Sequence, residues 1–153
     1  MSTFLAPISK DITKVLDYID RYESACLSIE PFFTLDGKKL LDICNTLPRK
    51  TLEFKQYDAE LKSIIELLEL KKSKVEGEKW KTLLEHNARH LASKDIQQYI
   101  KGDAEYVDIS ELIVEISHVR NKVNSVIEAL DIMHWQLNNS TKLAVASLED
   151  FVI

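Results

Sequence analysis

Apolar residues recur at alternating steps of three and four from Leu112 to Leu137, without an interruption. This heptad spacing places one apolar stripe along a helix, and the stripe needs a second helix to cover it. Ile109, Ile113 and Ile127 widen the stripe on one side. A helix of roughly 30 residues would be about 45 Å long. The stripe consists of Leu112, Ile116, Val119, Val123, Val126, Leu130, Met133 and Leu137.

A second heptad stripe runs from Phe54 to Val75 and is broken only by Lys71. Two such stripes predict two long helices with partners to pack against. The 153 residues include only three glycines and three prolines, too few for the many tight turns of a β-sandwich or barrel. We therefore expect an all-α fold, an elongated helical bundle with two long heptad-patterned helices and short connecting helices. The second stripe consists of Phe54, Tyr57, Leu61, Ile64, Leu68, Lys71 and Val75.

Shorter helices are predicted before the second stripe. Ser9 is predicted to cap a first helix that stops before Pro31. A second helix is predicted to follow Asp36 and to be interrupted at Pro48, which is tolerated in the first turn of a new helix. The residues predicted to point inward are Ile12, Val15, Leu16, Ile19 and Tyr22 in the first helix, and Leu40, Leu41, Ile43, Cys44 and Leu47 in the second.

Three further features are predicted to punctuate the rest of the chain. Gly77 weakens the third helix and permits a kink or a loop. A short amphipathic helix, SKDIQQYIKG, is predicted to begin near Ser93 and to end at Gly102 in the left-handed conformation. The polar residues at 138–140 are predicted to end the last heptad helix.

The predicted breaks divide one domain into three parts. Residues 1–48 form an N-terminal short-helix region, residues 49–137 form the main helical bundle, and residues 138–153 form an apolar C-terminal segment. Chain ends usually fray unless they dock, so an apolar end implies packing on the bundle or on a neighbouring subunit. We favour the neighbour, which makes this an oligomerisation segment. Its apolar residues include Leu143, Val145, Leu148, Phe151 and Val152.

Cys26 and Cys44 lie in apolar surroundings without a paired spacing, so we expect buried free thiols and a reducing compartment. The N-terminal stretch lacks a basic region followed by an apolar core, and no apolar run approaches about 18 residues. These features predict neither secretion nor membrane spanning, and they indicate a cytoplasmic protein.

Enzyme signatures are sparse. His86 and His90 lie four residues apart, a spacing that suits zinc on one helix face, but no third ligand is evident. Neither His118 nor His134 has an obvious nucleophile or carboxylate partner, and three glycines do not build a phosphate-binding loop. We therefore predict a protein without catalytic activity, metal or cofactor; zinc bound at His86 and His90 would revive an enzyme as a third alternative.

The net charge of −5 is unevenly distributed. Residues 49–81 carry a small positive excess, whereas residues 103–131 are strongly acidic. The most basic stretch, KKSKVEGEKWK at 71–81, is either a solvated helix face or a binding surface for a polyanion, and composition alone favours the solvated face. A local basic surface can hold a polyanion despite overall acidity, because charges act within a Debye length of about 8 to 10 Å. The basic and aromatic candidates are Arg49, Lys50, Lys71, Lys72, Lys74, Lys79, Trp80, Lys81, Arg89 and Lys94.

Three stretches follow one another in a recognisable order. A Lys-rich helix ends in Lys79 and Trp80, a short helix has the pattern D-I-x-x-Y-I-x-x-D, and a long helix runs to Trp135 and Leu137. In this order and spacing, over about 105 of the 153 residues, the chain resembles the UvsY-type recombination mediators of T4-like phages. The stretches are LPRKTLEFKQYDAELKSIIELLELKKSKVEGEKWKTLL, SKDIQQYIKGDAEYVDISELIVEISHVRNKVNSVIEAL and MHWQLNNSTKL.

The resemblance implies a non-enzymatic homo-oligomer that binds single-stranded DNA and helps a RecA-like recombinase to replace the single-strand binding protein. Lysines would pair with phosphates, a tryptophan would stack on bases, and the terminal segment would hold subunits together. The family usually continues its aromatic residue with paired tyrosines and a Gly-Lys, where this chain has Lys81, Thr82, Leu83 and Leu84. The DNA-binding residues that the resemblance selects are Lys71, Lys72, Lys74, Lys79, Trp80, Lys81, Arg89, Lys94 and Trp135.

The competing class is a scaffold or interaction protein. Its heptad stripes would engage a partner helix, and its acidic last helix would dock a basic protein without contact to DNA.

Overall fold

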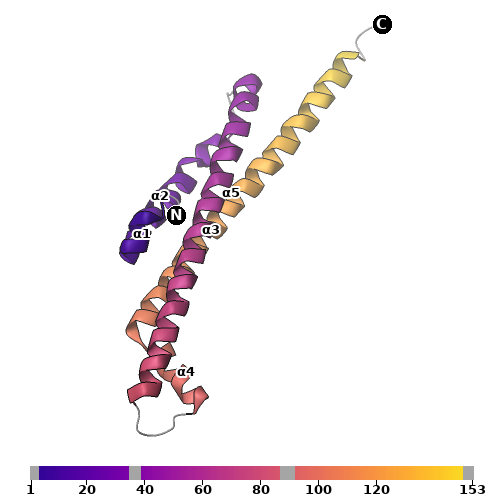
Figure 1. Cartoon of the computed structure of the whole chain (residues 1–153). Coiled ribbons are helices and arrows are strands. Elements are labelled where there is room, and N and C mark those ends of the chain that lie inside the picture. Colours follow the sequence, from indigo (N-terminus) through magenta and orange to yellow (C-terminus); the bar gives the residue numbers. More distant parts are fainter. Residues whose placement is uncertain (1–3, 35–38, 87–91, 150–153) are drawn as a thin grey trace.

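The computed structural model describes residues 4–34, 39–86 and 92–149, and every regular element in these ranges is helical. Two long helices dominate: α3 (Leu40–His86) has 47 residues and α5 (Ala104–Glu149) has 46. They run antiparallel and form an elongated hairpin, which the short helix α4 (Ser93–Lys101) closes at one end (Figure 1). The predicted all-α, elongated bundle with two long heptad-patterned helices is therefore confirmed.

The two heptad stripes form the core between α3 and α5. Every stripe residue of α3 is buried or partly buried, including Tyr57 and Lys71, which lie at its margin. The stripe of α5 is likewise covered along its length, and the described part of the chain buries no polar or charged residue. The most deeply buried residues of the two stripes are Phe54, Leu61, Ile64 and Leu68 on α3, and Ile116, Val119, Val123 and Leu130 on α5.

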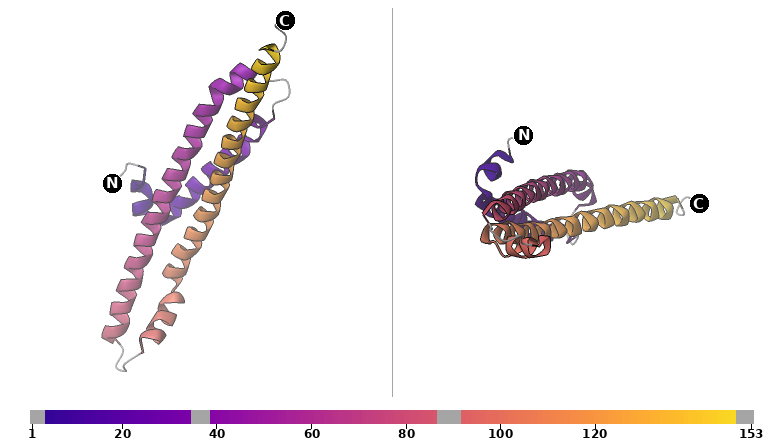
Figure 2. Two further views of the ribbon diagram at one scale, coloured as in Figure 1. Left: turned by 90° about the vertical axis from the view of Figure 1, so that its right-hand side faces the viewer. Right: turned by 60° about the horizontal axis from the view of Figure 1, so that its bottom comes forward.

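A shorter arm of helices packs along the hairpin. It comprises α1 (Ala6–Lys10), the 3-10 turn η1 (Ile12–Lys14), α2 (Val15–Ser28) and the 3-10 turn η2 (Glu30–Phe32). Figure 2 shows this arm crossing the two long helices on one side. Asp11, not Ser9, is the capping residue, because its carboxylate accepts hydrogen bonds from the backbone amide and hydroxyl of Thr13. The prediction of a Ser9 cap is therefore wrong.

Polar contacts tie the three long elements together. The guanidinium of Arg120 on α5 donates to the carboxylate of Asp58 on α3, with Nε 2.6 Å from Oδ1. Lys122 on α5 pairs with Glu23 on α2. The hydroxyl of the fully buried Tyr22 donates a short hydrogen bond to Glu60 on α3. These contacts fix the rotation of each helix about its axis.

The predicted interruptions of α3 at Pro48 and Gly77 are absent, because the helix runs through both positions. Proline inside a helix costs about 3 kcal/mol, since it removes a hydrogen bond and crowds the preceding turn. Buried Ile43 and Leu47 before the proline, and Phe54 after it, pack in the same core and hold the helix together. A Cβ added at Gly77 would meet nothing within 4 Å, so no close contact requires that glycine.

Two predictions about the later elements are also wrong. Gly102 has φ −92° and ψ −3°, which is right-handed, and α5 starts two residues later with Asp103 accepting from the Glu105 amide. Helix α5 continues through 138–140 to Glu149. The predicted boundaries at 48/49 and 137/138 therefore fall inside continuous helices.

Some residues predicted to point inward are exposed, namely Leu16, Leu40, Leu41 and Cys44. Both cysteines are free, as predicted, but Cys26 is half-buried and Cys44 is exposed instead of both being buried. Asp36, predicted to precede the second helix, lies outside the described residues. Within the described ranges, no helix combines the length and the apolar character needed to cross a membrane.

Candidate nucleic-acid interface

The closed end of the hairpin contains most of the DNA-binding residues predicted from the sequence. It is built from the last turns of α3, from α4 and from the first turns of α5 (Figure 2). Helix α4 buries Ile96 and Ile100 and exposes the residues between them, as its amphipathic pattern predicts. The arrangement brings the lysines of 71–81 close to the acidic start of α5.

Three of the predicted lysines are used inside the molecule. The Lys71 ammonium donates to the carbonyl oxygen of Ser9 at 2.8 Å. The Lys72 ammonium lies 5.0 Å from the centre of the Tyr106 ring, within the range of a cation–π interaction. Lys79 forms an ion pair of 2.8 Å with Asp103. The three partners lie 24 to 62 residues away in the sequence, and the partner of Lys71 is a backbone carbonyl. The local spacing of the lysines therefore gives no sign of them.

The pair between Lys79 and Asp103 clamps the end of α3 to the start of α5. Its hydrogen bond raises the pKa of Lys79 and lowers the pKa of Asp103. Glu105 lies 4.0 Å from the same ammonium and adds to this attraction. Both sides of the pair are charged at neutral pH, so Lys79 is already neutralised before any DNA phosphate arrives.

Three other predicted cations remain at the surface. Lys74 and Lys81 are exposed and approach Glu78 and Glu85 only at 3.8 Å, one helical turn away. Such exposed pairs contribute about 0.3 to 0.5 kcal/mol and give way readily to another anion. Lys94 at the start of α4 is also exposed. Arg89, predicted as a DNA contact, lies outside the described residues.

The aromatic candidates do not lie together. Trp80 is half-buried near the closed end, whereas Trp135 is 66% exposed towards the other end of α5. The 32 residues from Ala104 to Trp135 correspond to roughly 47 Å of helix, so one short groove does not include both rings. Tyr99 on α4 is 64% exposed and lies on the same short helix as Lys94. It belongs to the family-like pattern but is not among the DNA contacts predicted from the sequence.

Sequence reasoning also left Lys55 and Lys62 aside, and both are exposed on α3. What marks these two lysines as available is the position of the nearby acidic side chains, which only the structure reveals. Counting charge along 49–62 averages these lysines with Glu53, Asp58 and Glu60, and all three acids are partly buried against other residues.

Residues 138–149 of the predicted oligomerisation segment form the last turns of α5 and extend beyond the start of α3 (Figures 1 and 2). The Leu143 and Val145 side chains are 71% and 51% exposed. Ile132 and Trp135, roughly two to three turns before Leu143, are also exposed, so the apolar surface extends into the preceding turns. Leu148, Phe151 and Val152 were also predicted to contact a neighbouring subunit. The side chain of Leu148 and the whole of Phe151 and Val152 lie outside the part of the chain that the structure describes.

The described residues contain no group of three histidines, cysteines or acids placed to hold a metal ion. His118 and His134 are exposed on α5, and His90 lies outside the described ranges.

Fold and surface together define an elongated, all-helical hairpin with exposed cations on its longest helices and an apolar end. No family model, curated protein or solved structure matches the chain.

Proposed function

We propose that this protein is a non-enzymatic recombination mediator that acts in the cytoplasm. In this proposal it self-associates, binds single-stranded DNA and promotes the loading of a RecA-like recombinase in place of the single-strand binding protein. The proposal takes its biological role from the resemblance to UvsY-type mediators.

The observation that carries DNA binding is the division of the nine cations of α3 into two groups. Four are partly buried and engaged: Lys50 with Glu53, Lys71 with Ser9, Lys72 with Tyr106, and Lys79 with Asp103. The other five are exposed and remain available to phosphates. They are Arg49, Lys55, Lys62, Lys74 and Lys81.

Self-association would compensate for the weakness of this surface on one chain. Exposed leucine and valine side chains at 143 and 145, with Ile132 and Trp135 nearby, supply an apolar area that a neighbouring subunit can cover. An assembly that repeats one weak basic surface gains affinity by avidity without any stronger single contact. A net-acidic subunit could then hold a polyanion.

The test is binding of a fluorescent single-stranded oligonucleotide at low and physiological salt, with the mass of the protein measured in the same samples. We expect a defined oligomer whose affinity falls steeply with salt, because cations that neutralise phosphates release counterions. Leu143→Asp with Val145→Asp should lower the mass and weaken DNA binding while leaving the helical circular dichroism intact. An oligomer that shows no binding even at low salt would eliminate the DNA role.

The scaffold function remains the second candidate, and one observation favours it. A shallow cavity at the start of α5 has an apolar floor of Tyr106, Val107 and Val114 and a rim that includes Glu111 and Glu115. This combination fits an amphipathic basic segment of another protein. A partner retained by a variant that has lost all DNA binding would support the scaffold.

A further inference from the structure

We propose that the surface of α3 around Arg49, Lys55 and Lys62 is the principal binding site for single-stranded DNA. We call this surface the 49–62 face. The inference rests on the proposed function and changes its location, because the sequence pointed to residues 71–81 instead.

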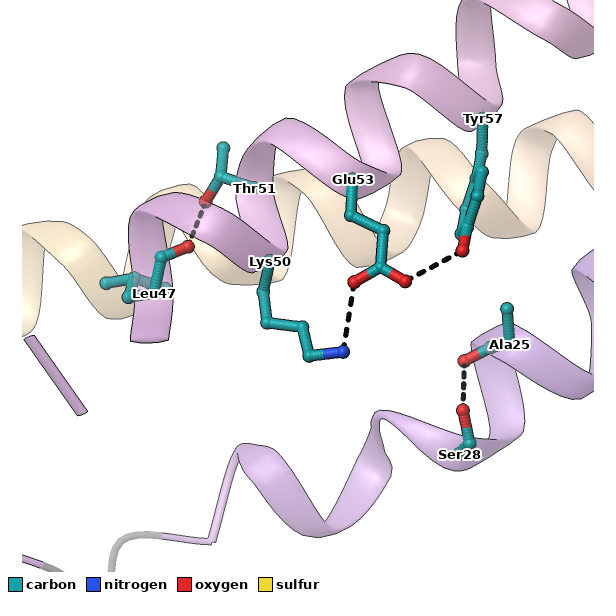
Figure 3. A network of polar contacts seen from close by, with 7 residues as sticks. All are labelled: Ala25, Ser28, Leu47, Lys50, Thr51, Glu53 and Tyr57. Atoms are coloured by element: carbon teal, nitrogen blue, oxygen red, sulfur yellow. Dashed lines mark hydrogen bonds and ion pairs between the residues drawn. The ribbon is translucent and has the colours of Figure 1, made fainter. Parts of the chain in front are cut away.

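The three acids between residues 49 and 62 are all engaged inside the molecule. Glu53 pairs with Lys50 at 3.0 Å and accepts from the Tyr57 hydroxyl at 2.7 Å, and Figure 3 shows these three residues of α3 with their side chains towards α2. Asp58 is held by Arg120 of α5. Glu60 accepts from Tyr22 of α2 and from Gln56 of its own helix. Each of these carboxylates is therefore partly buried and already has a partner.

The cations of the same stretch have the opposite arrangement. Arg49, Lys55 and Lys62 are exposed, and within the described ranges none of them forms an ion pair. Successive residues of a helix are roughly 100° apart, so Arg49, Lys55 and Lys62 fall within a sector of about 140° of the helix circumference. Between Leu41 and Lys62 this sector contains no acidic residue. The sector also includes Leu52, which is 70% exposed. The 49–62 face thus combines three unpaired positive charges with an accessible apolar residue.

The continuation of α3 is different. Between residues 66 and 85 its exposed cations are Lys74 and Lys81. The exposed acids of that stretch outnumber them by five to two: Glu66, Glu69, Glu76, Glu78 and Glu85. The exposed surface of residues 66–85 is therefore net negative, and within 71–81 the two exposed lysines are matched by two exposed glutamates, so the positive surface of α3 lies at 49–62.

Trp135 is not part of this face. The pairs Arg120–Asp58 and Lys79–Asp103 set the antiparallel register, which places Trp135 level with residues 43–47. By helical geometry its side chain points about 160° from both Met133 and Leu137, which are buried in the core stripe of α5. The ring therefore points away from α3.

Lys55 lies on the side of α3 away from α2. It points about 60° from Asp58, which faces α5, and about 160° from Tyr57, which contacts Tyr22 of α2. Cations that follow the phosphate backbone are the electrostatic component of sequence-tolerant single-strand binding.

Two triple variants with equal changes in charge test the location. Arg49→Glu, Lys55→Glu and Lys62→Glu alter the 49–62 face, and Lys74→Glu, Lys81→Glu and Lys94→Glu alter the closed end. Both change the net charge by the same amount, so their long-range effects match and the difference is local. The first variant should lose binding to a fluorescent single-stranded oligonucleotide. The slope of log affinity against log salt concentration should become shallower by about 2. Three phosphate contacts are lost, and roughly 0.7 counterions are released per contact.

Single substitutions provide independent readouts. Trp135→Ala and Tyr99→Ala each remove an exposed ring that lies outside the 49–62 face, and each should leave the binding affinity and the salt slope unaltered. Circular dichroism melts and the oligomer mass, recorded for every variant, exclude effects of misfolding or dissociation.

Each outcome has a distinct meaning. Loss of binding in the 49–62 variant with retention in the closed-end variant supports the inference. Retention in the 49–62 variant, or equal losses in both, overturns it while the mediator function stands. Failure of the unaltered protein to bind DNA at low salt instead overturns the proposed function.

Discussion

The contact between Tyr22 and Glu60 offers a direct test of how α2 is held to the hairpin. Tyr22 is fully buried, its ring centre lies 5.2 Å from that of Tyr57, and its hydroxyl donates to Glu60. Tyr22→Phe keeps the ring and removes only the hydroxyl, whereas Tyr22→Ala removes both. The two variants therefore separate hydrogen bonding from packing.

The expected losses differ in size. A hydrogen bond to a charged group contributes about 1.5 to 3 kcal/mol. Glu60 is partly exposed and keeps Gln56 as a donor, so the lower end of that range applies to Tyr22→Phe. Truncating a buried aromatic ring to alanine costs about 3 to 5 kcal/mol. For a chain of this size, 1 kcal/mol corresponds to roughly 2 to 4 °C in Tm.

The dependence on pH identifies the hydroxyl specifically. Burial, followed by the hydrogen bond to Glu60, raises the pKa of Tyr22 well above its usual value near 10. The unfolded chain then releases this proton at a lower pH than the folded chain does. The stabilising contribution is complete below about pH 10 and is lost as the pH rises towards the folded pKa, by up to about 1.4 kcal/mol per pH unit.

Urea denaturation of the wild-type and Tyr22→Phe proteins between pH 8 and pH 11 measures this contribution. The slope assigned to Tyr22 should disappear in the phenylalanine variant. Equal losses for Tyr22→Phe and Tyr22→Ala, or an unchanged slope above pH 10, would refute the assignment of a stabilising hydroxyl contact.

Four further predictions concern other elements. Asp103→Asn should release the clamp on Lys79 and speed amide hydrogen exchange at the closed end at pH 7, with little change in Tm; unchanged exchange would argue against the clamp. In the wild-type protein the same clamp should weaken below about pH 4, as Asp103 becomes protonated through its lowered pKa, and this can be followed by the same exchange measurement. Pro48→Ala should raise the free energy of unfolding by about 1 to 2 kcal/mol, since it restores a helical hydrogen bond but loses proline's restriction of the unfolded chain; a lower Cm in urea would contradict this. Leu130→Ala should cost about 2 to 5 kcal/mol in the same assay, because its side chain is fully buried in the α5 stripe.

The heptad stripes were predictable because burial in a helical pair depends on a periodic spacing that the sequence displays directly. The positions of the helix ends were not. Residues such as Pro48 and Asn138 weaken a helix locally, but packing of Ile43, Leu47 and Leu137 on the facing helix outweighs these local preferences.

The candidate site was less predictable than the fold, for a different reason. The sequence shows where lysines occur but not which of them have partners from distant parts of the chain. Lys79 has such a partner in Asp103, and Lys71 has one in the Ser9 carbonyl. The availability of Lys55 depends equally on contacts that turn Asp58 and Glu60 inward. Net charge along a window cannot separate these cases.

The end of α5 has a consequence for how the protein responds to its own concentration. The register places Leu40, the first residue of α3, opposite residues 138–142, so the turns from there to Glu149 have no facing helix among the residues that the structure describes. An isolated helical segment of fewer than about 12 residues is marginal in water. If a neighbour covers Leu143 and Val145, the helix content of these turns should rise with protein concentration and follow the same isotherm as the mass. Folding of the last turns of α5 and assembly of the subunits would then be one equilibrium.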